Sequence, residues 1–273
     1  MAAKGQIIVL SGVTSAAPAS APKIEMNAAD LVAVKIASLK HVVSAKALTP
    51  LPAGGVSGRC RATGQALVPK GTISALEIST IGGKKGLGIG SSGTAVAGLA
   101  LPPGSFPASF TAIMAINVGT QSLASSGATT FLSAFDNADT WMAQMLRYNG
   151  SGAAGTAENK FATRGNTTTG TVIESVRLAG SWNIAVVDYN NATRLVSLGI
   201  NASSGFATIG SPTARTPATT EYVELGYHLS SSGLKDSKIG DLYLFDTSLA
   251  STGVGLAQLA ELVAAMKSDY AIP

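Results

Sequence analysis

Short apolar segments separated by turn residues fill the chain from about residue 60 to its end. Side chains alternate between the two faces of a β-strand, and residues 109–118 follow that alternation closely. Segments of this kind recur about every ten residues with Gly, Asn or Ser between them, which is typical of a β-sandwich or a barrel. The pattern therefore predicts an all-β fold. The apolar residues expected on one face of 109–118 are Phe110, Ala112, Met114, Ile116 and Val118.

The C-terminal part of the chain predicts one more strand and a helix. Residues 239–246 are largely apolar on both faces, with Ile239, Tyr243 and Phe245 on one of them, so this strand should be covered on both sides. Residues 256–267 place apolar side chains at spacings of three and four, the period of an amphipathic helix. We expect this apolar stripe to pack on the sheet that the preceding strand joins. The stripe consists of Leu256, Leu259, Leu262, Val263 and Met266.

The first 55 residues are predicted to form an N-terminal extension or attachment arm, with a short strand near its start at 6–10. Apolar positions in 28–43 fit either a helix or an alternating strand, and Asn27 followed by Asp30 favours a helix with a capped start. A Pro- and Gly-rich stretch at 49–55 is the clearest break in the pattern. It predicts a boundary between an extension over residues 1–55 and a sandwich domain over residues 56–273.

The composition argues against several classes of function. Basic residues number 19 and acidic residues 15, for a net charge of +4, and no basic cluster is longer than Lys84-Lys85. Nucleic-acid binding needs a concentrated basic surface, so it is not expected. No segment reaches the roughly eighteen apolar residues of a membrane-spanning helix, and we expect no secretion signal. The single cysteine, Cys60, cannot form an intrachain disulfide, which fits synthesis in a reducing cytoplasm.

The C-terminal segment also resembles a known family. Gly-Asp-Leu-Tyr-Leu-Phe-Asp at 240–246, the leucine-rich helix after it and the closing Tyr270 resemble the end of the concanavalin A-like lectin and glucanase family, the laminin-G-like β-sandwiches. A strand with Trp182, the hairpin after it and a Leu-Gly strand recur in that family in this order. The resemblance covers residues 64–273, and the glycine- and alanine-rich setting is most similar to the copies found in bacteriophage virion proteins.

This resemblance implies a jelly-roll sandwich of two antiparallel sheets with a short C-terminal helix and an N-terminal extension. It also implies a non-catalytic structural or adhesive role in a virion, as a capsid decoration or a head, tail-fibre or spike component made in the host cytoplasm. The implied partners are other virion proteins, further copies of the chain in a homo-oligomer such as a trimer, and host surface glycans. The alternative is a lectin-type glycan-binding module, and a polysaccharide hydrolase is a third hypothesis.

Candidate catalytic groups do not form a recognisable motif. The related glucanases carry Glu-x-Asp-x-x-Glu on one strand, because alternation then brings two carboxylates to one face. No such sequence occurs, and Glu221 and Glu224 should lie on opposite faces. His41 and His228 accompany no nucleophile motif, and we expect no histidine or second cysteine near Cys60. We therefore expect no enzymatic activity and no required cofactor.

Two acidic turns remain as candidate binding sites. Each places Asp and Asn beside an aromatic residue, and sugar sites combine an aromatic face with hydrogen bonds from such side chains. Calcium, which requires six to eight oxygen ligands, is the other candidate ligand. Asp and Asn are also the favoured residues of ordinary turns, which is the alternative interpretation. The candidate glycan- or calcium-binding residues are Asp136, Asn137, Asp139, Trp141, Asp188, Tyr189 and Asn190.

Overall fold

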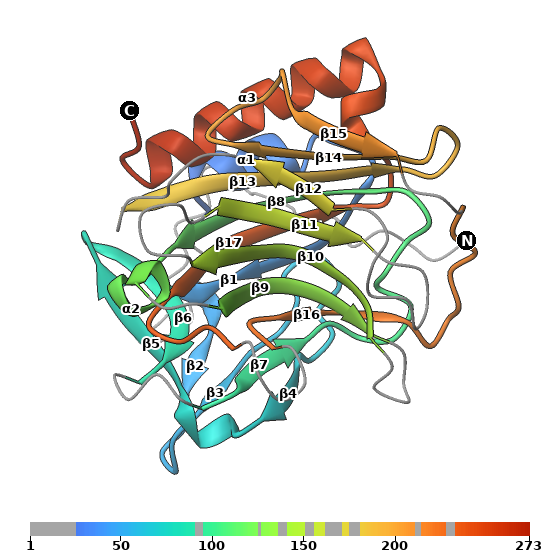
Figure 1. The fold of residues 1–273 in the computed structure, drawn as a ribbon. Coiled ribbons are helices and arrows are strands. Elements are labelled where there is room, and N and C mark those ends of the chain that lie inside the picture. The colour runs from blue at the N-terminus through green and yellow to red at the C-terminus, as the bar shows by residue number, and fades with distance from the viewer. Residues whose placement is uncertain are drawn as a thin grey trace, which may run out of the picture.

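The computed structural model describes residues 26–90, 95–124, 127–135, 141–150, 156–161, 171–174, 181–210, 214–227 and 233–273. These residues form a sandwich of two antiparallel sheets with a long helix on its outside, as the sequence predicts (Figure 1). The expected strand at 6–10 lies outside the described residues. Within the described ranges, no helix is long and apolar enough to cross a membrane.

The larger sheet has eight strands within the described residues and contains the strands predicted at 109–118 and 239–246. Its order is β15-β14-β13-β8-β17-β6-β5, and β1 also pairs with β17. Because β17 has β8 on one side, β1 and β6 share its other side. The strands are β1 (Leu39–Ser44), β5 (Leu76–Ile81), β6 (Lys84–Ile89), β8 (Phe110–Asn117), β13 (Trp182–Asn190), β14 (Leu195–Ile200), β15 (Ala207–Gly210) and β17 (Lys238–Phe245).

The second sheet has seven strands within the described residues, in the order β12-β11-β10-β9-β16-β7-β4, and faces the viewer in Figure 1. Its strands are β4 (Val68–Gly71), β7 (Ala97–Ala100), β9 (Gly127–Phe135), β10 (Trp141–Gly150), β11 (Thr156–Phe161), β12 (Thr171–Glu174) and β16 (Tyr222–Leu225). A small hairpin and short helical turns connect these strands. They are β2 (Thr49–Pro50), β3 (Val56–Ser57), η1 (Ala45–Ala47), η2 (Ile73–Ala75), α2 (Thr120–Ala124) and η4 (Leu249–Ser251).

The main hydrophobic core lies between the two sheets and confirms the alternation predicted for β8. Met114 and Ile116 belong to this core, whereas Ile113 and Ala115 face the opposite side of the sheet and join a second apolar cluster. Burying one such side chain stabilises the fold by roughly 1.5–3 kcal/mol. The residues of β8 and of the position after it that face the main core are Phe110, Ala112, Met114, Ile116 and Val118.

The second apolar cluster lies between the eight-stranded sheet and two helices, α1 (Ala28–Ala33) and α3 (Gly253–Asp269), which lie side by side in Figure 1. Helix α3 begins after Thr252, whose Oγ1 accepts a hydrogen bond from the Gly255 backbone at 3.0 Å. The predicted helix is therefore confirmed, and it extends beyond 256–267 at both ends. Its buried face includes Leu259, Leu262, Val263 and Met266.

Strand β17 is covered on both faces, as predicted, but one residue lies on the other face. The register of β17 against β8 shifts between Ile239 and Leu242, which indicates a β-bulge. Because of this shift, Ile239 joins Leu242 in the main core, while Tyr243 and Phe245 pack under the helices. The expectation that Ile239 shares a face with Tyr243 was therefore wrong.

The segment around 28–43 contains both of the alternatives that its sequence allows. Asn27 and Asp30 form the expected capping box at the start of α1. The helix ends at Ala33, and β1 then pairs with β17 from Leu39 onward. Helix α1 and strand β1 therefore pack on the sandwich, while the boundary between residues 1–55 and 56–273 stays a prediction.

Candidate functional site

The strand ends that flank the two acidic turns of the sequence lie at the same end of the sandwich. Strand β13 ends at Asn190, and β10 begins at Trp141 opposite Phe135 at the end of β9. Phe135 is also paired with Tyr222, so the end of β9 adjoins the start of β16. Residues 136–140, including Asp136, Asn137 and Asp139, and the Trp141 side chain lie outside the described residues, so their role stays a prediction.

Arg215 connects the two sheets at this end. Its Nη2 donates to Glu221 Oε2 at 2.6 Å, and its guanidinium lies 3.5 Å from the centre of the Phe106 ring. The Asn191 side chain bonds to the Arg215 backbone in both directions, at 2.6 and 2.9 Å. The turn after β13 is therefore fixed to the start of β16.

The side chains of Asp188 and Tyr189 support this end from below its surface. Asp188 is 2% exposed, and it accepts hydrogen bonds from Thr111 Oγ1 at 2.5 Å and Ser248 Oγ at 2.6 Å. Burial raises the pKa of the Asp188 carboxyl, and these hydrogen bonds oppose the rise. The Tyr189 ring is fully buried near Phe110, with 6.0 Å between ring centres.

Calcium does not fit the oxygens of this turn. The Asp188 carboxylate accepts from two hydroxyls and from the Ala250 backbone at 3.3 Å, so its acceptor positions are already used. The Asn190 Oδ1 accepts from the backbone of Ala192 at 2.9 Å and of Thr193 at 3.2 Å. In the part of the chain that the structure describes, no group of three or more His, Cys, Asp or Glu residues could hold a metal ion.

A depression of about 660 Å³ opens above Asp188 at this end, and we call it the Asp246 depression. It lies where β17, η4 and the start of α3 meet the turn after β13. Its apolar walls come mainly from Ile36, Leu249 and Val254. Its polar lining is rich in hydroxyls and consists of Ser38, Ser109, Asn190, Asp246, Thr247, Ser248, Ser251, Thr252 and Gln258.

Several polar groups in the Asp246 depression remain available to a ligand. The Asp246 side chain is exposed, and no hydrogen bond from the described residues reaches its carboxylate. The Asn190 oxygen caps its own turn, which leaves the amide nitrogen as a donor. The hydroxyls of Ser38 and Thr247 likewise make no hydrogen bond within the described chain. The depression thus offers a carboxylate, an amide and hydroxyls beside apolar walls.

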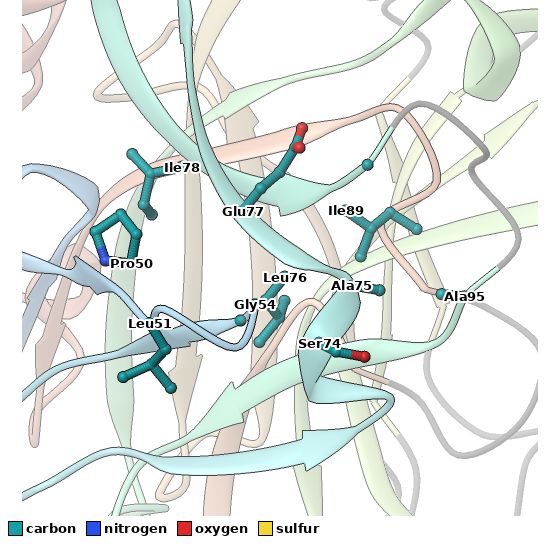
Figure 2. A pocket seen from close by; sticks show the side chains of 12 residues that line it. Pro50, Leu51, Gly54, Ser74, Ala75, Leu76, Glu77, Ile78, Ile89 and Ala95 are labelled. Atoms are coloured by element: carbon teal, nitrogen blue, oxygen red, sulfur yellow. The ribbon is translucent and has the colours of Figure 1, made fainter.

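A second hollow of about 390 Å³ lies between the β2–β3 hairpin and strands β5 and β6 (Figure 2). Its lining is mostly apolar, including Leu51 and Ile78, and its charged residue is Glu77. Lys238 Nζ donates to Glu77 Oε1 at 3.2 Å and to the Ile89 carbonyl at 3.0 Å. The Glu77 carboxylate is therefore already paired, so this hollow offers fewer polar groups to a ligand than the Asp246 depression.

Two pairs of chemically active side chains were missed by sequence reasoning. His41 Nδ1 lies 3.4 Å from Cys60 Sγ, so the expectation of no histidine near this thiol was wrong. Both side chains are buried, and burial, together with the Lys40 charge, lowers the pKa of His41 to about 4. Lys70 Nζ lies 3.6 Å from Glu224 Oε1 on the seven-stranded sheet. Neither pair borders the Asp246 depression.

Several solved structures are similar to this sandwich in fold. Domain 4 of the extracellular arabinanase AbnA from Geobacillus stearothermophilus, solved with arabinotriose, is 13% identical with a TM-score of 0.53, over 83% of this chain and 98% of that domain. The botulinum neurotoxin serotype D binding domain is 10% identical with a TM-score of 0.53, over 82% of this chain and 52% of that one. Trypanosoma rangeli sialidase in complex with sialic acid is 11% identical with a TM-score of 0.54, over 85% of this chain and 33% of the sialidase chain.

These likenesses concern the fold, because the identities are low. The chain spans nearly all of the arabinanase domain but about half of the neurotoxin binding domain and a third of the sialidase. No protein-family model matches the chain, and no curated protein matches it in sequence. The fold is an antiparallel β-sandwich with a C-terminal helix.

Proposed function

We propose that this chain is a non-catalytic glycan-binding module whose ligand occupies the Asp246 depression. The observation that carries the proposal is the set of available groups there: one carboxylate, an amide nitrogen and hydroxyls next to Leu249 and Val254. Sugars present hydroxyls to such groups and C–H faces to apolar walls. Glycoside hydrolysis generally requires two carboxylates flanking the bond, and the lining supplies one, Asp246.

The arabinanase domain supports the proposed class of ligand. That domain was solved with arabinotriose. The fold shared with this chain covers 98% of the domain. A short oligosaccharide also suits a depression of about 660 Å³, which is within the usual range of ligand sites, about 300–1,000 Å³. We therefore propose short oligosaccharides as the ligands.

The proposal is tested by screening the purified chain on a glycan array and measuring arabinotriose binding by calorimetry. Thr247→Val removes one exposed hydroxyl of the depression and should weaken binding about fivefold to tenfold, as expected for one lost hydrogen bond. Thr80→Val, at an exposed position of β5 outside the depression, is the matched control and should bind normally. Absence of binding to any glycan by the unmodified chain would refute the proposal.

The virion role expected from the sequence stays a second proposal. Its support is the resemblance of the glycine- and alanine-rich sequence to phage copies of this fold, and a glycan-binding surface would suit an adhesive particle protein. Mass spectrometry of purified particles would test it directly. Light scattering of the purified chain would test the expected homo-oligomer, for which a trimer predicts about three times the mass of 27.3 kDa.

A further inference from the structure

We infer that Asp246 makes the Asp246 depression select neutral over acidic glycans. This inference rests on the proposed function and adds to it the residue that determines specificity and the charge of the ligand. It follows from where the carboxylate is held, from the charges around it and from the nearby end of α3.

The backbone that carries Asp246 is fixed on both sides. The Asp246 N–H donates to the Ser38 carbonyl at 2.9 Å, which ties the end of β17 to the segment before β1. Thr111 Oγ1, which donates to Asp188, accepts from the Leu249 N–H at 2.8 Å and lies 3.1 Å from the Thr247 carbonyl oxygen. Asp188 then holds the Ser248 hydroxyl at 2.6 Å. The exposed carboxylate therefore extends from a rigid support and loses little freedom when it binds a ligand.

Asp246 is the only charged residue among the described residues that line the depression. Lys35, on the adjacent segment, is 4.0 Å from Glu261 and is not part of the lining. Asp188, beneath the surface, is another carboxyl and supplies no positive charge. An acidic ligand would thus face a carboxylate with no cation beside it in the described lining, whereas neighbouring hydroxyls of a neutral sugar would donate to it.

One feature of the depression favours anions, and it must be weighed against Asp246. The start of α3 contributes Thr252 and Val254 to the lining, and a helix N-terminus carries about half a positive charge. The Asp246 carboxylate carries a full negative charge, so it outweighs the helix end. Removing the Asp246 charge would leave the helix end alone, and the preference for neutral ligands should then reverse.

The test compares two derivatives of arabinotriose that differ in charge at one end. Oxidation of C1 gives an acid, and reduction of C1 gives a neutral alditol with the same opened ring. Binding of each is measured by calorimetry at low and high salt. We expect the unmodified chain to bind the alditol at least tenfold more tightly than the acid, and high salt should reduce this difference.

The variant Asp246→Asn should bind the alditol several-fold more weakly and the acid several-fold more tightly than the unmodified chain. Asp246→Ser should show the same change in ratio, which separates lost charge from an effect of the amide. Glu261→Gln, which removes an exposed carboxylate from α3 outside the lining of the depression, is the control and should leave both affinities unchanged. Unfolding temperatures of all three variants should match, because these side chains are exposed.

Two outcomes would overturn the inference, and they are distinguishable. If the unmodified chain binds a glycan but the acid-to-alditol ratio is the same in Asp246→Asn, the selection by Asp246 is refuted and glycan binding stands. If the unmodified chain binds neither derivative nor any glycan on the array, the proposed function fails, and the inference fails with it.

Discussion

The hydroxyl of Tyr270 occupies the space that a side chain at position 240 would need, so Gly240 and Tyr270 fit together only because one of them is glycine. The Tyr270 ring packs against Trp182 with 4.9 Å between ring centres and an angle of 57°. Burial raises the pKa of the Tyr270 hydroxyl, which remains protonated beside Asp241. Gly240 of the sequence motif and the closing Tyr270 therefore pack directly against each other, where β17 meets the end of α3.

Gly240→Ala should destabilise the protein by about 1–3 kcal/mol, because the new methyl group overlaps a buried ring that cannot move away freely. Gly253→Ala is the control, since no atom outside its own helix lies within 4 Å of the added methyl group. That change should stabilise α3 by up to about 1 kcal/mol. Urea unfolding measures both, and equal effects of the two substitutions would contradict the proposed contact.

Lys70→Met should cost about 1.5–3 kcal/mol, because it removes the lysine that lies 3.6 Å from the Glu224 carboxylate, which is 0% exposed. Lys35→Met provides the comparison. Its partner Glu261 is 4.0 Å away, with the two side chains 71% and 59% exposed, so the expected cost is about 0–1 kcal/mol. Thermal or urea unfolding would show the difference, and a cost below about 1 kcal/mol at Lys70 would contradict the importance of the buried pair.

His41 should make the protein less stable as the pH falls below neutrality. Its pKa is lowered from 6.5 in the unfolded chain to about 4 in the folded chain, so the unfolded chain takes up the proton first. The resulting stability is complete above about pH 6.5 and is lost between pH 6.5 and 4, by about 3 kcal/mol in total.

The His41 effect is isolated by comparing the unmodified chain with His41→Asn in urea at several pH values. Buried carboxyls with raised pKa, such as Asp188 and Asp241, have the opposite sign, because their folded forms gain protons first as the pH falls. These groups contribute equally to both proteins and cancel in the difference. A difference that stays constant from pH 7 to pH 4 would rule out titration of His41.

Asp188→Asn should weaken glycan binding as well as stability, although Asp188 does not line the depression. An amide can replace only one of the two carboxylate oxygens that accept from Thr111 and Ser248. We expect a stability loss of about 1–3 kcal/mol and a several-fold weaker affinity for arabinotriose. If the affinity is unchanged while stability falls, the floor of the depression does not depend on Asp188.

Hydrophobic periodicity was sufficient to predict the buried face of an element wherever all of its residues follow one period. The alternation in β8 and the spacing of three and four in α3 each identified the buried face correctly. The bulge in β17 could not be predicted from the sequence. Both faces of this strand are buried, so an apolar residue such as Ile239 fits either face. Likewise, His41 and Cys60 meet because the Arg61 N–H donates to the Val42 carbonyl at 2.8 Å, a contact that no local pattern records.

Of the residues predicted for the candidate site, Asn190 lines the Asp246 depression, and whether any of them binds a ligand stays a prediction. Alternation along β13 would have placed Tyr189 with Ala185 and Val187 in the core, so the signal for its burial was present. Asp246 was visible only as the last residue of a motif. Its backbone is held by the Ser38 carbonyl, which comes from a segment distant in the sequence.

Strand β17 pairs with three strands that precede it along the chain, and this order has a consequence during synthesis on the ribosome. Until residues 238–245 emerge, β8 has no neighbour on one side, and β1 and β6 have no common partner. Such unpaired edges readily join other polypeptides. The nascent chain is therefore prone to aggregation through most of translation. This tendency ends only when β17 pairs with these strands and α3 covers the outer face of the sheet.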